Sequence, residues 1–348
     1  MIVVHIESGL GNQMLSYCEY LALKKIHPED NIYIENLIYD IPAAANVINQ
    51  WNGYELERIF GISEPNIKGL FSNAEWSQIM KEITDSRFWE KNWNYPPYIV
   101  AALNRHGLSL KNMRGDFEAG NITGELSRSS LCVPDWIKQT GWYAYLRMLY
   151  FRFFKKNAVI DDRKMLFYHE KDDIFTGQRL SFKDKGNDIS LIDDQIRKAF
   201  RFPTIADERN VQFSEKILEC ESVAIHARRG DMLTANGRYY KSGYFRRAVK
   251  YIKKHVGSPV FFFFCDPGSI EWCKENSRTF GLDYSKDKVF FVDWNTGEES
   301  FRDMQLMAMC KHNIITNSSF GWWGAYLNEN PDKITISPEI EINTTYHC

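Results

Sequence analysis

The chain has 348 residues, more than a single hydrophobic core usually holds, and we therefore expect two domains. Its formal net charge of −2 gives no overall basic field, which argues against nucleic acid as a partner. It contains no apolar run near the ~20 residues of a membrane span, and its first residues lack the pattern of a signal peptide.

The cysteine pattern predicts a cytoplasmic protein with reduced thiols. Seven cysteines are scattered along the chain without a C-x-x-C pair, which fits neither a disulfide framework nor a zinc site. The sequence also lacks H-E-x-x-H and any pair of aspartates at positions i and i+2. We expect no metal and no cofactor, so an anionic ligand would have to be met by side chains and backbone.

The first half begins with a strand at residues 2–6, a glycine-bearing loop and a helix. This order can bring backbone N–H groups and the helix dipole to an anion, which makes Gly11 and Asn12 candidate binding residues. A tight turn without any ligand is the alternative for the same residues. A second strand is predicted at 32–34, and the end of another helix at 56–60.

Residues 68–187 are rich in tryptophan and tyrosine and show little regular periodicity. Within them, the run 142–156 combines aromatic residues with arginines and lysines. This run predicts a core helix with basic ends, and a helix lying on a membrane surface is the alternative.

The second half alternates predicted strands and helices, which favours a parallel sheet with right-handed crossovers. A helix at 244–255 is expected to begin after a cap at Ser242, with its basic face in solvent. The predicted strands lie at 222–226, 260–264, 289–292, 313–316 and 333–337, and the other helices at 192–200, at 300–310 and after Ser319. Trp322 and Trp323 are expected in the core.

Polar residues follow several of these strands, where the carboxyl ends of parallel strands would bring them to one crevice. They are His226 with Arg228, Asp266, Asp293, and the run 317–319. This placement predicts a ligand site at one edge of the sheet.

The polar cluster that ends the strand at His226 suits an anionic ligand, because arginine presents a planar fork of donors to phosphate oxygens. A surface turn in which Arg228 and Arg229 pair with Asp231 is the alternative. Ser318 and Ser319 begin a helix, where they could hold phosphate oxygens; a helix cap at Ser319 is compatible with that role.

Four segments resemble the α-1,2-fucosyltransferase family. They are G-L-G-N-Q-M at 9–14, H-A-R-R-G-D at 226–231, F-F-C-D with E-W-C-K at 263–274, and D-M-Q-L-M-A-M-C-K-H-N-I-I-T-N-S-S-F-G-W-W-G-A-Y-L at 303–327. Ser8 stands where the family more often has glycine, and Pro267 replaces a second acidic residue. Residues 65–190 carry no resemblance.

The resemblance implies an α/β, GT-B-like fold with two facing Rossmann-like domains and a parallel sheet in each. Residues 1–205 would form the N-terminal domain, with an irregular aromatic-rich region on the acceptor side. Residues 206–348 would bind GDP-fucose. The implied reaction is inverting, metal-independent transfer of L-fucose from GDP-fucose to a glycan hydroxyl, O-2 of a terminal β-galactoside. The predicted location is the cytoplasm, and peripheral contact with the inner membrane is left open.

The resemblance also implies roles for single residues. Arg228 would contact the β-phosphate, Asp303 the guanine, and Asn12 the diphosphate or fucose. For Asp303, stabilisation by the helix dipole is the plainer reading. The remaining candidate binding residues are Gly11, His226, Arg229, Asp266, Asn317, Ser318, Ser319 and Phe320.

The general base stays open between Asp231 and His226. Asp231 lies further past the turn, but it could instead be a structural partner of Arg229. His226 could instead touch the nucleotide or orient the loop. The functional alternatives are a fucosyltransferase of another linkage, an enzyme using a different GDP-sugar, and a silent GDP-sugar or glycan-binding protein.

Overall fold

The computed structural model describes residues 1–44, 52–88, 95–113, 173–177, 192–230, 233–338 and 345–347, together with positions 137, 140, 142, 143, 145 and 146. The chain divides into two compact units. The first contains Met1–Leu131 and Ile160–Pro203, and the second contains Cys132–Val159 and Thr204–Cys348. The sequence places the domain boundary after residue 205.

The first unit contains a four-stranded parallel sheet in the order β2-β1-β4-β3. Its strands are β1 (Ile2–His5), β2 (Ile32–Glu35), β3 (Lys111–Asn112) and β4 (Ile174–Thr176), and its helices are α1 (Leu10–Ile26), α2 (Leu56–Phe60), α3 (Asn73–Asp85), α5 (Pro96–Arg105) and α9 (Asp193–Ala199). All four residues of β1 are buried, as expected for a central parallel strand.

Helices α3 and α5 pack on each other in the aromatic-rich region. A capping box between Ser72 and Glu75 starts α3, and its core face carries Trp76, Ile79 and Ile83 at helical spacing. These three side chains join one hydrophobic cluster with residues of β1, β4 and α5. The region therefore contains regular secondary structure that the sequence analysis did not predict.

The second unit contains a six-stranded parallel sheet in the order β10-β9-β8-β5-β6-β7. Its strands are β5 (Ser222–Ala227), β6 (Val260–Cys265), β7 (Val289–Val292), β8 (His312–Ile314), β9 (Thr335–Ser337) and β10 (Tyr346–His347), and its helices are α10 (Glu208–Leu218), α11 (Leu233–Lys241), α12 (Tyr244–His255), α13 (Ile270–Glu275), α14 (Ser277–Phe280), α15 (Phe301–Met309) and α16 (Ser319–Leu327). The strand order reverses between β5 and β8, as in doubly wound nucleotide-binding folds.

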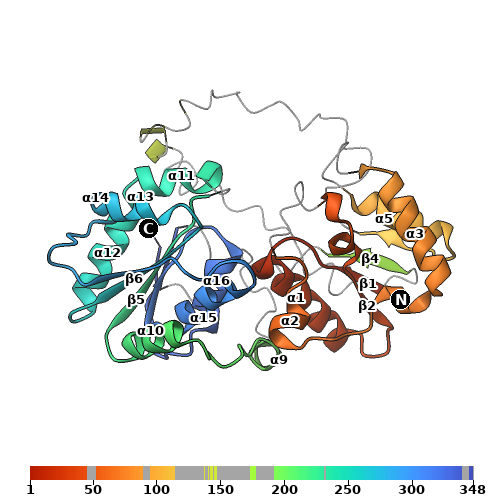
Figure 1. Cartoon of the computed structure of the whole chain (residues 1–348), viewed down its shortest axis with the longest axis horizontal. Coiled ribbons are helices and arrows are strands. Elements are labelled where there is room, and N and C mark those ends of the chain that lie inside the picture. The colour runs from red at the N-terminus through yellow and green to blue at the C-terminus, as the bar shows by residue number, and fades with distance from the viewer. Residues whose placement is uncertain are drawn as a thin grey trace. The chain divides into compact units, whose positions relative to one another are not determined.

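Helices cover both faces of this second sheet (Figure 1). Phe261 and Phe263 of β6 point to one face and pack in a cluster with α11, α12 and α14. Phe262 points to the other face, where it meets Phe213 of α10 at 5.4 Å between ring centroids. The predicted α/β class, with a parallel sheet in each unit, is confirmed.

Several sequence predictions can be compared directly with these elements. The helix at 244–255 is confirmed with the same ends, but its N-cap is Gly243 and not Ser242. The chain turns at Gly243 with φ of +77°, a conformation that favours glycine. The burial of Trp322 and Trp323 is also confirmed.

Most of the run 142–156 lies outside the described residues. The side chains of Trp142, Tyr145 and Leu146 are exposed by 59%, 51% and 52%, so the predicted core helix is wrong for these three positions. Aromatic residues mixed with basic ones do not by themselves define a buried face.

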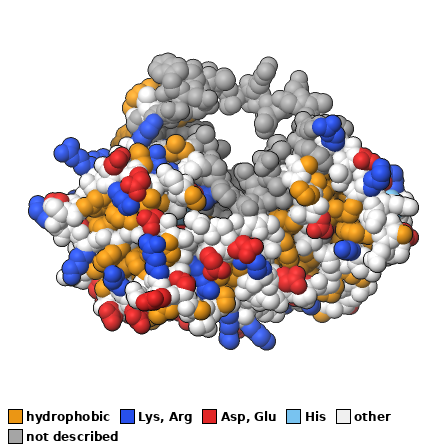
Figure 2. Space-filling model, viewed as in Figure 1, with side chains coloured by type: hydrophobic (Ala, Val, Ile, Leu, Met, Phe, Trp, Pro, Cys, Tyr) orange, Lys and Arg blue, Asp and Glu red, His pale blue; other side chains and the backbone are white. Residues whose placement is uncertain are grey.

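The visible surface mixes lysines and arginines with acidic side chains over both units (Figure 2). Within the part of the chain that the structure describes, no helix is both long and apolar enough to cross a bilayer.

Candidate active site

The candidate site lies where the second sheet changes direction. Strands β5 and β8 are neighbours, and the strand order reverses between them. In open α/β sheets, ligands bind at such a reversal, at the carboxyl ends of the strands. His226 is in β5, Arg228 follows it, Asp266 follows β6, and Ser318 follows β8. The structure therefore brings the predicted strand-end residues to one edge.

Asp266 holds the turn after β5 and the side chain of Arg228. Its Oδ1 lies 2.5 Å from Arg228 Nη1, and its Oδ2 accepts the backbone N–H groups of Arg229 at 2.5 Å and Gly230 at 2.9 Å. A Cβ at Gly230 would lie 3.2 Å from Asp266 Cγ, so glycine permits this close approach. Both carboxylate oxygens of Asp266 thus contact groups of the protein itself. We therefore expect Asp266 to position Arg228 and not to bind a ligand directly.

The side chain of Arg229 stacks on aromatic rings. Its guanidinium lies 3.4 Å from the ring centroid of Trp272 on α13 and 5.1 Å from that of Tyr240 on α11. Asp231 lies outside the described residues, so its roles as base or as partner of Arg229 stay predictions. The contacts of Arg229 instead anchor the turn that carries Arg228.

His226 is a buried neutral imidazole. Burial, and then the positive charge of Arg228, lowers the pKa of His226 to about 3. Its Nδ1 has no hydrogen-bond partner within the described part of the chain, and its ring lies 5.9 Å from that of Phe320. A group this weakly basic is a poor general base near neutral pH, which favours the alternative in which His226 contacts a ligand or supports the loop.

Gly321 allows helix α16 to approach His226. A Cβ at Gly321 would overlap Nδ1 of the imidazole and lie 2.9 Å from its Cγ. Substituting Gly321→Ala should therefore displace the ring or the start of α16, at a cost of about 1–3 kcal/mol in free energy of unfolding. Urea denaturation checks this, with Gly257→Ala as the control because no atom lies within 4 Å of that Cβ. Equal stability of the two variants would contradict the packing described.

Helix α16 begins at the predicted pair of serines. Ser318 is the N-cap, with φ of −151° and ψ of 132°, and its side chain makes no capping hydrogen bond. Ser319 is the first helical residue, so the predicted cap at Ser319 is wrong by one position. No acidic residue occupies the first turn, which leaves the positive end of the helix dipole to attract an anion.

Asp303 lies in the first turn of α15 and is half-buried. Burial raises the pKa of Asp303 to about 8, against the opposing effect of a hydrogen bond of 2.8 Å from the amide of Asn295. Stabilisation by the helix dipole would lower this pKa, so burial is the larger effect here. A half-buried carboxyl group of this kind is typical of a functional site.

In the first unit, the loop before α1 is organised by its own side chains. Gln13 is fully buried; its Nε2 donates to the carbonyl of Ser8 at 2.9 Å, and its Oε1 accepts the backbone N–H of Glu55 at 2.9 Å. Asn12 Nδ2 donates to Ser8 Oγ at 3.0 Å. Ser8 has φ of +71°, which accounts physically for a preference for glycine at this position.

The N-terminus of α1 also meets a carboxylate of the protein itself. The backbone N–H of Leu10 hydrogen-bonds to Glu55, whose side chain is buried and lies 2.9 Å from Arg58. This contact gives the tight-turn alternative a structural basis. Binding of a ligand by Gly11 and Asn12 stays a prediction.

The sequence analysis missed a buried polar chain at the carboxyl end of β1. Nδ1 of His5 donates to Glu35, its Nε2 donates to Tyr95 Oη at 3.0 Å, and Tyr95 donates to Glu7. Although burial lowers the pKa of His5, the two carboxylates outweigh it and raise that pKa overall. The signal available in the sequence was the presence of His5 and Glu7 in and directly after an otherwise apolar strand.

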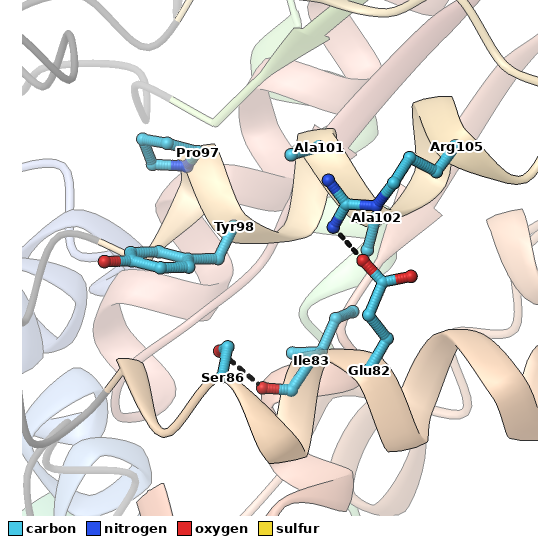
Figure 3. Close-up of a pocket in the computed structure, with 8 residues that line it drawn as sticks. All are labelled: Glu82, Ile83, Ser86, Pro97, Tyr98, Ala101, Ala102 and Arg105. Atoms are coloured by element: carbon cyan, nitrogen blue, oxygen red, sulfur yellow. Dashed lines mark hydrogen bonds and ion pairs between the residues drawn. The ribbon is translucent and has the colours of Figure 1, made fainter.

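A separate groove of about 300 Å³ lies between α3 and α5 of the first unit (Figure 3). Its walls include Ile83, Pro97 and Tyr98, and an ion pair between Glu82 and Arg105 crosses it. None of the predicted site residues lines this groove.

The second unit has the strand order of a dinucleotide-binding fold, with an arginine and a helix N-terminus at its switch point. These features are typical of α/β domains that bind nucleotides. Residues 127–347 match the family described as glycosyl transferase family 11, and the chain belongs to that family. The resemblance in the sequence motifs is thereby confirmed.

Two curated relatives extend over nearly the whole chain, and a third matches a shorter part of it. An alpha-1,2-colitosyltransferase of Escherichia coli is 38% identical over 97% of this chain and 91% of its own. The O-antigen biosynthesis glycosyltransferase WbnK of Escherichia coli is 35% identical over 96% and 92%. A galactoside alpha-(1,2)-fucosyltransferase 1 of Saimiri sciureus is 34% identical over 30% of this chain and 28% of its own.

Among solved structures, fucosyltransferase NodZ from Bradyrhizobium is similar with a TM-score of 0.46 and 14% identity, covering 94% of this chain and 92% of that one.

Proposed function

We propose that this glycosyltransferase transfers L-fucose from GDP-fucose to O-2 of a terminal β-galactoside, with inversion and without a metal ion. The observation that carries the proposal is Arg228, held by Asp266 at the switch point of the second sheet. Two of the relatives carry a 1,2 linkage in their names, and one of these is a galactoside fucosyltransferase. GDP-fucose supplies the sugar as substrate, so no cofactor is needed.

The proposed reaction breaks the bond between the anomeric carbon of fucose and the β-phosphate oxygen. The electron pair stays on that oxygen, the acceptor hydroxyl forms the new bond from the opposite side, and its proton leaves to a base or to water. Negative charge thus grows on the phosphate, where Arg228 and the N–H groups at the start of α16 can stabilise it. Their fixed positions reduce the reorganisation needed during the reaction.

A second candidate is colitosyl transfer, because a relative with that name is 38% identical over 97% of the chain. Colitose is fucose without its 3-hydroxyl group. A site that hydrogen-bonds a hydroxyl discriminates against the analogue lacking it by about 10⁴–10⁵-fold. A fucosyltransferase site that hydrogen-bonds this hydroxyl should therefore use GDP-fucose far more efficiently than GDP-colitose.

A donor and acceptor screen tests the proposal. The purified protein is given GDP-fucose or GDP-colitose, with lactose or without an acceptor, and released GDP is measured. We expect GDP-fucose with lactose to give the highest rate. A higher rate with GDP-colitose would select the second candidate, and binding of GDP without release from any donor would identify a silent sugar-nucleotide-binding protein.

Activity should persist in excess EDTA, because the proposed site meets the diphosphate with an arginine and a helix N-terminus. We expect the rate of GDP release to be the same, within about a factor of two, before and after chelation. Activity that is lost with EDTA and restored by Mn²⁺ or Mg²⁺ would show that the reaction needs a metal ion.

A further inference from the structure

Asn210, on α10, is the centre of a buried hydrogen-bond network in the second unit. Its side chain is 2% exposed. Its Oδ1 accepts from Trp294 Nε1 at 2.8 Å, and its Nδ2 donates to Asp207 Oδ2 at 3.0 Å and to Asn295 Oδ1 at 2.8 Å. Asn295 in turn donates to Asp303 Oδ1 at 2.8 Å. The network joins the start of α10, the loop after β7, and α15.

The chemistry of these partners fixes which way each amide points. The indole N–H of Trp294 can only donate, and the carboxylate of Asp207 accepts, so the Oδ1 and Nδ2 atoms of Asn210 cannot exchange places. Asn210 therefore presents N–H to Asn295 Oδ1, and Asn295 must turn its own N–H toward Asp303. The orientation of Trp294 is in turn supported by Arg209, whose guanidinium lies 3.8 Å from the indole centroid.

As a result, the carboxyl group of Asp303 is fixed by a hydrogen bond to one of its two oxygens. Oδ1 receives the donor from Asn295, whereas Oδ2 has no hydrogen-bond partner among the residues that the structure describes. The thiol of Cys265, at the end of β6, interacts electrostatically with Asp303, and Arg302 precedes Asp303 on α15. Arg302 donates to Glu299 at 3.1 Å and to Gln305 at 2.7 Å.

We propose that the amide pair of Asn210 and Asn295 positions Asp303 to accept the N1–H and exocyclic N–H of a guanine base. This inference rests on the proposed use of a GDP-sugar. Two adjacent donors are presented by guanine and not by adenine, so a carboxylate with one open oxygen discriminates between the two bases. In this arrangement Asn210 and Asn295 are positioning residues, and Asp303 is the residue that contacts the ligand.

The arrangement makes GDP affinity depend on pH. Only the ionised carboxyl accepts from both guanine groups, and burial raises the pKa of Asp303 to about 8. Binding GDP should therefore release a proton, and affinity should rise with pH up to about 8. Because the donor from Asn295 favours the ionised form, its removal should move that rise to higher pH.

Calorimetric titration of GDP and ADP from pH 6 to 9 tests the inference. Asn295→Ala should weaken GDP binding about 10-fold at pH 7, the effect of one hydrogen bond to a charged group, and move the midpoint of the pH profile upward. ADP affinity should be the same in both proteins. The control is Thr296→Ala, an exposed neighbour in the same loop.

Trp294→Phe is a milder second variant. It keeps a ring against Phe213 and Arg209 but removes the indole donor that fixes Asn210. It should move the pH midpoint in the same direction as Asn295→Ala. The melting temperatures of both variants and of the parent protein are also measured, so that loss of the fold can be distinguished from loss of GDP binding.

The outcomes separate the inference from the proposed function. If Asp303→Asn removes the pH dependence while Asn295→Ala and Trp294→Phe leave its midpoint unchanged, the positioning role is wrong and guanine recognition by Asp303 stands. If the parent protein binds GDP no better than ADP, or Asp303→Asn leaves GDP affinity and its pH profile unchanged, guanine recognition fails and the inference fails with it. A GDP-fucose turnover that persists in that case would preserve the proposed function.

Discussion

Replacing Arg228 with lysine is expected to lower the turnover of GDP-fucose by at least about 10²-fold. The guanidinium is held by Asp266 at 2.5 Å, which fixes its position after β5. Lysine keeps the charge but not the planar fork, so it cannot bind Asp266 and a phosphate oxygen with the same geometry. Steady-state rates of GDP release give the measurement.

The matched control is Arg246→Lys, an exposed arginine on α12 of the same unit. It should leave turnover unchanged. Both variants should melt near the parent temperature, because the charge at each position is retained. Near-normal turnover of the Arg228→Lys variant would contradict the proposed role of Arg228 in stabilising the phosphate.

Replacing His5 with leucine is expected to lower the free energy of unfolding by about 3–5 kcal/mol. Nδ1 of His5 donates to Glu35, and neither side chain is exposed to solvent. Without the imidazolium, Glu35 would remain as a buried charge whose remaining hydrogen bond of 2.6 Å comes from the backbone N–H of Leu37. Urea denaturation at pH 6 measures the loss, with His255→Leu, an exposed histidine, as control.

The stability contributed by His5 should also depend on pH. Its pKa is raised in the folded protein, mainly by Glu35 acting against burial. The stabilisation is therefore fully present below the unfolded value of about 6.5 and is lost as pH rises through the higher folded pKa. The difference between parent and variant should shrink at alkaline pH. A difference that is constant from pH 6 to 9 would contradict a charged His5.

The second unit could be predicted from the sequence largely because its strands are short apolar runs between polar turns. The run 260–264, for example, is apolar throughout and becomes β6, and 244–255 becomes α12 with the same ends. Strand–helix alternation then fixes a parallel sheet. Helix α10 was missed because Asn210 occupies a core-facing position, which interrupts the apolar spacing to Phe213 and Ile217.

The first unit was harder to predict because its sheet is assembled from distant, very short segments. Strand β3 has two residues and β4 has three, and both pair within the sheet that begins with β1. Such short strands carry no readable periodicity. Helix α3 did have a readable signal in its capping box and apolar spacing.

In the candidate site, too, local features could be predicted from the sequence, whereas contacts between distant residues could not. The sequence correctly placed Arg228 after a strand and Asp303 in the first turn of a helix, because strand ends and helix starts can be recognised locally. It could not assign Asp266 to the turn after β5, 37 positions away in the chain, or Asn210 to Asn295, 85 positions away. Those partnerships depend on tertiary packing, which no local pattern specifies.

The most direct test of the proposed reaction is the structure of its product. The protein is incubated with GDP-β-L-fucose and lactose, and the purified trisaccharide is analysed by NMR. Inverting transfer predicts an α-configured fucose attached to O-2 of galactose. A β-configured product, attachment at another hydroxyl, or fucose released only as the free sugar would contradict the account.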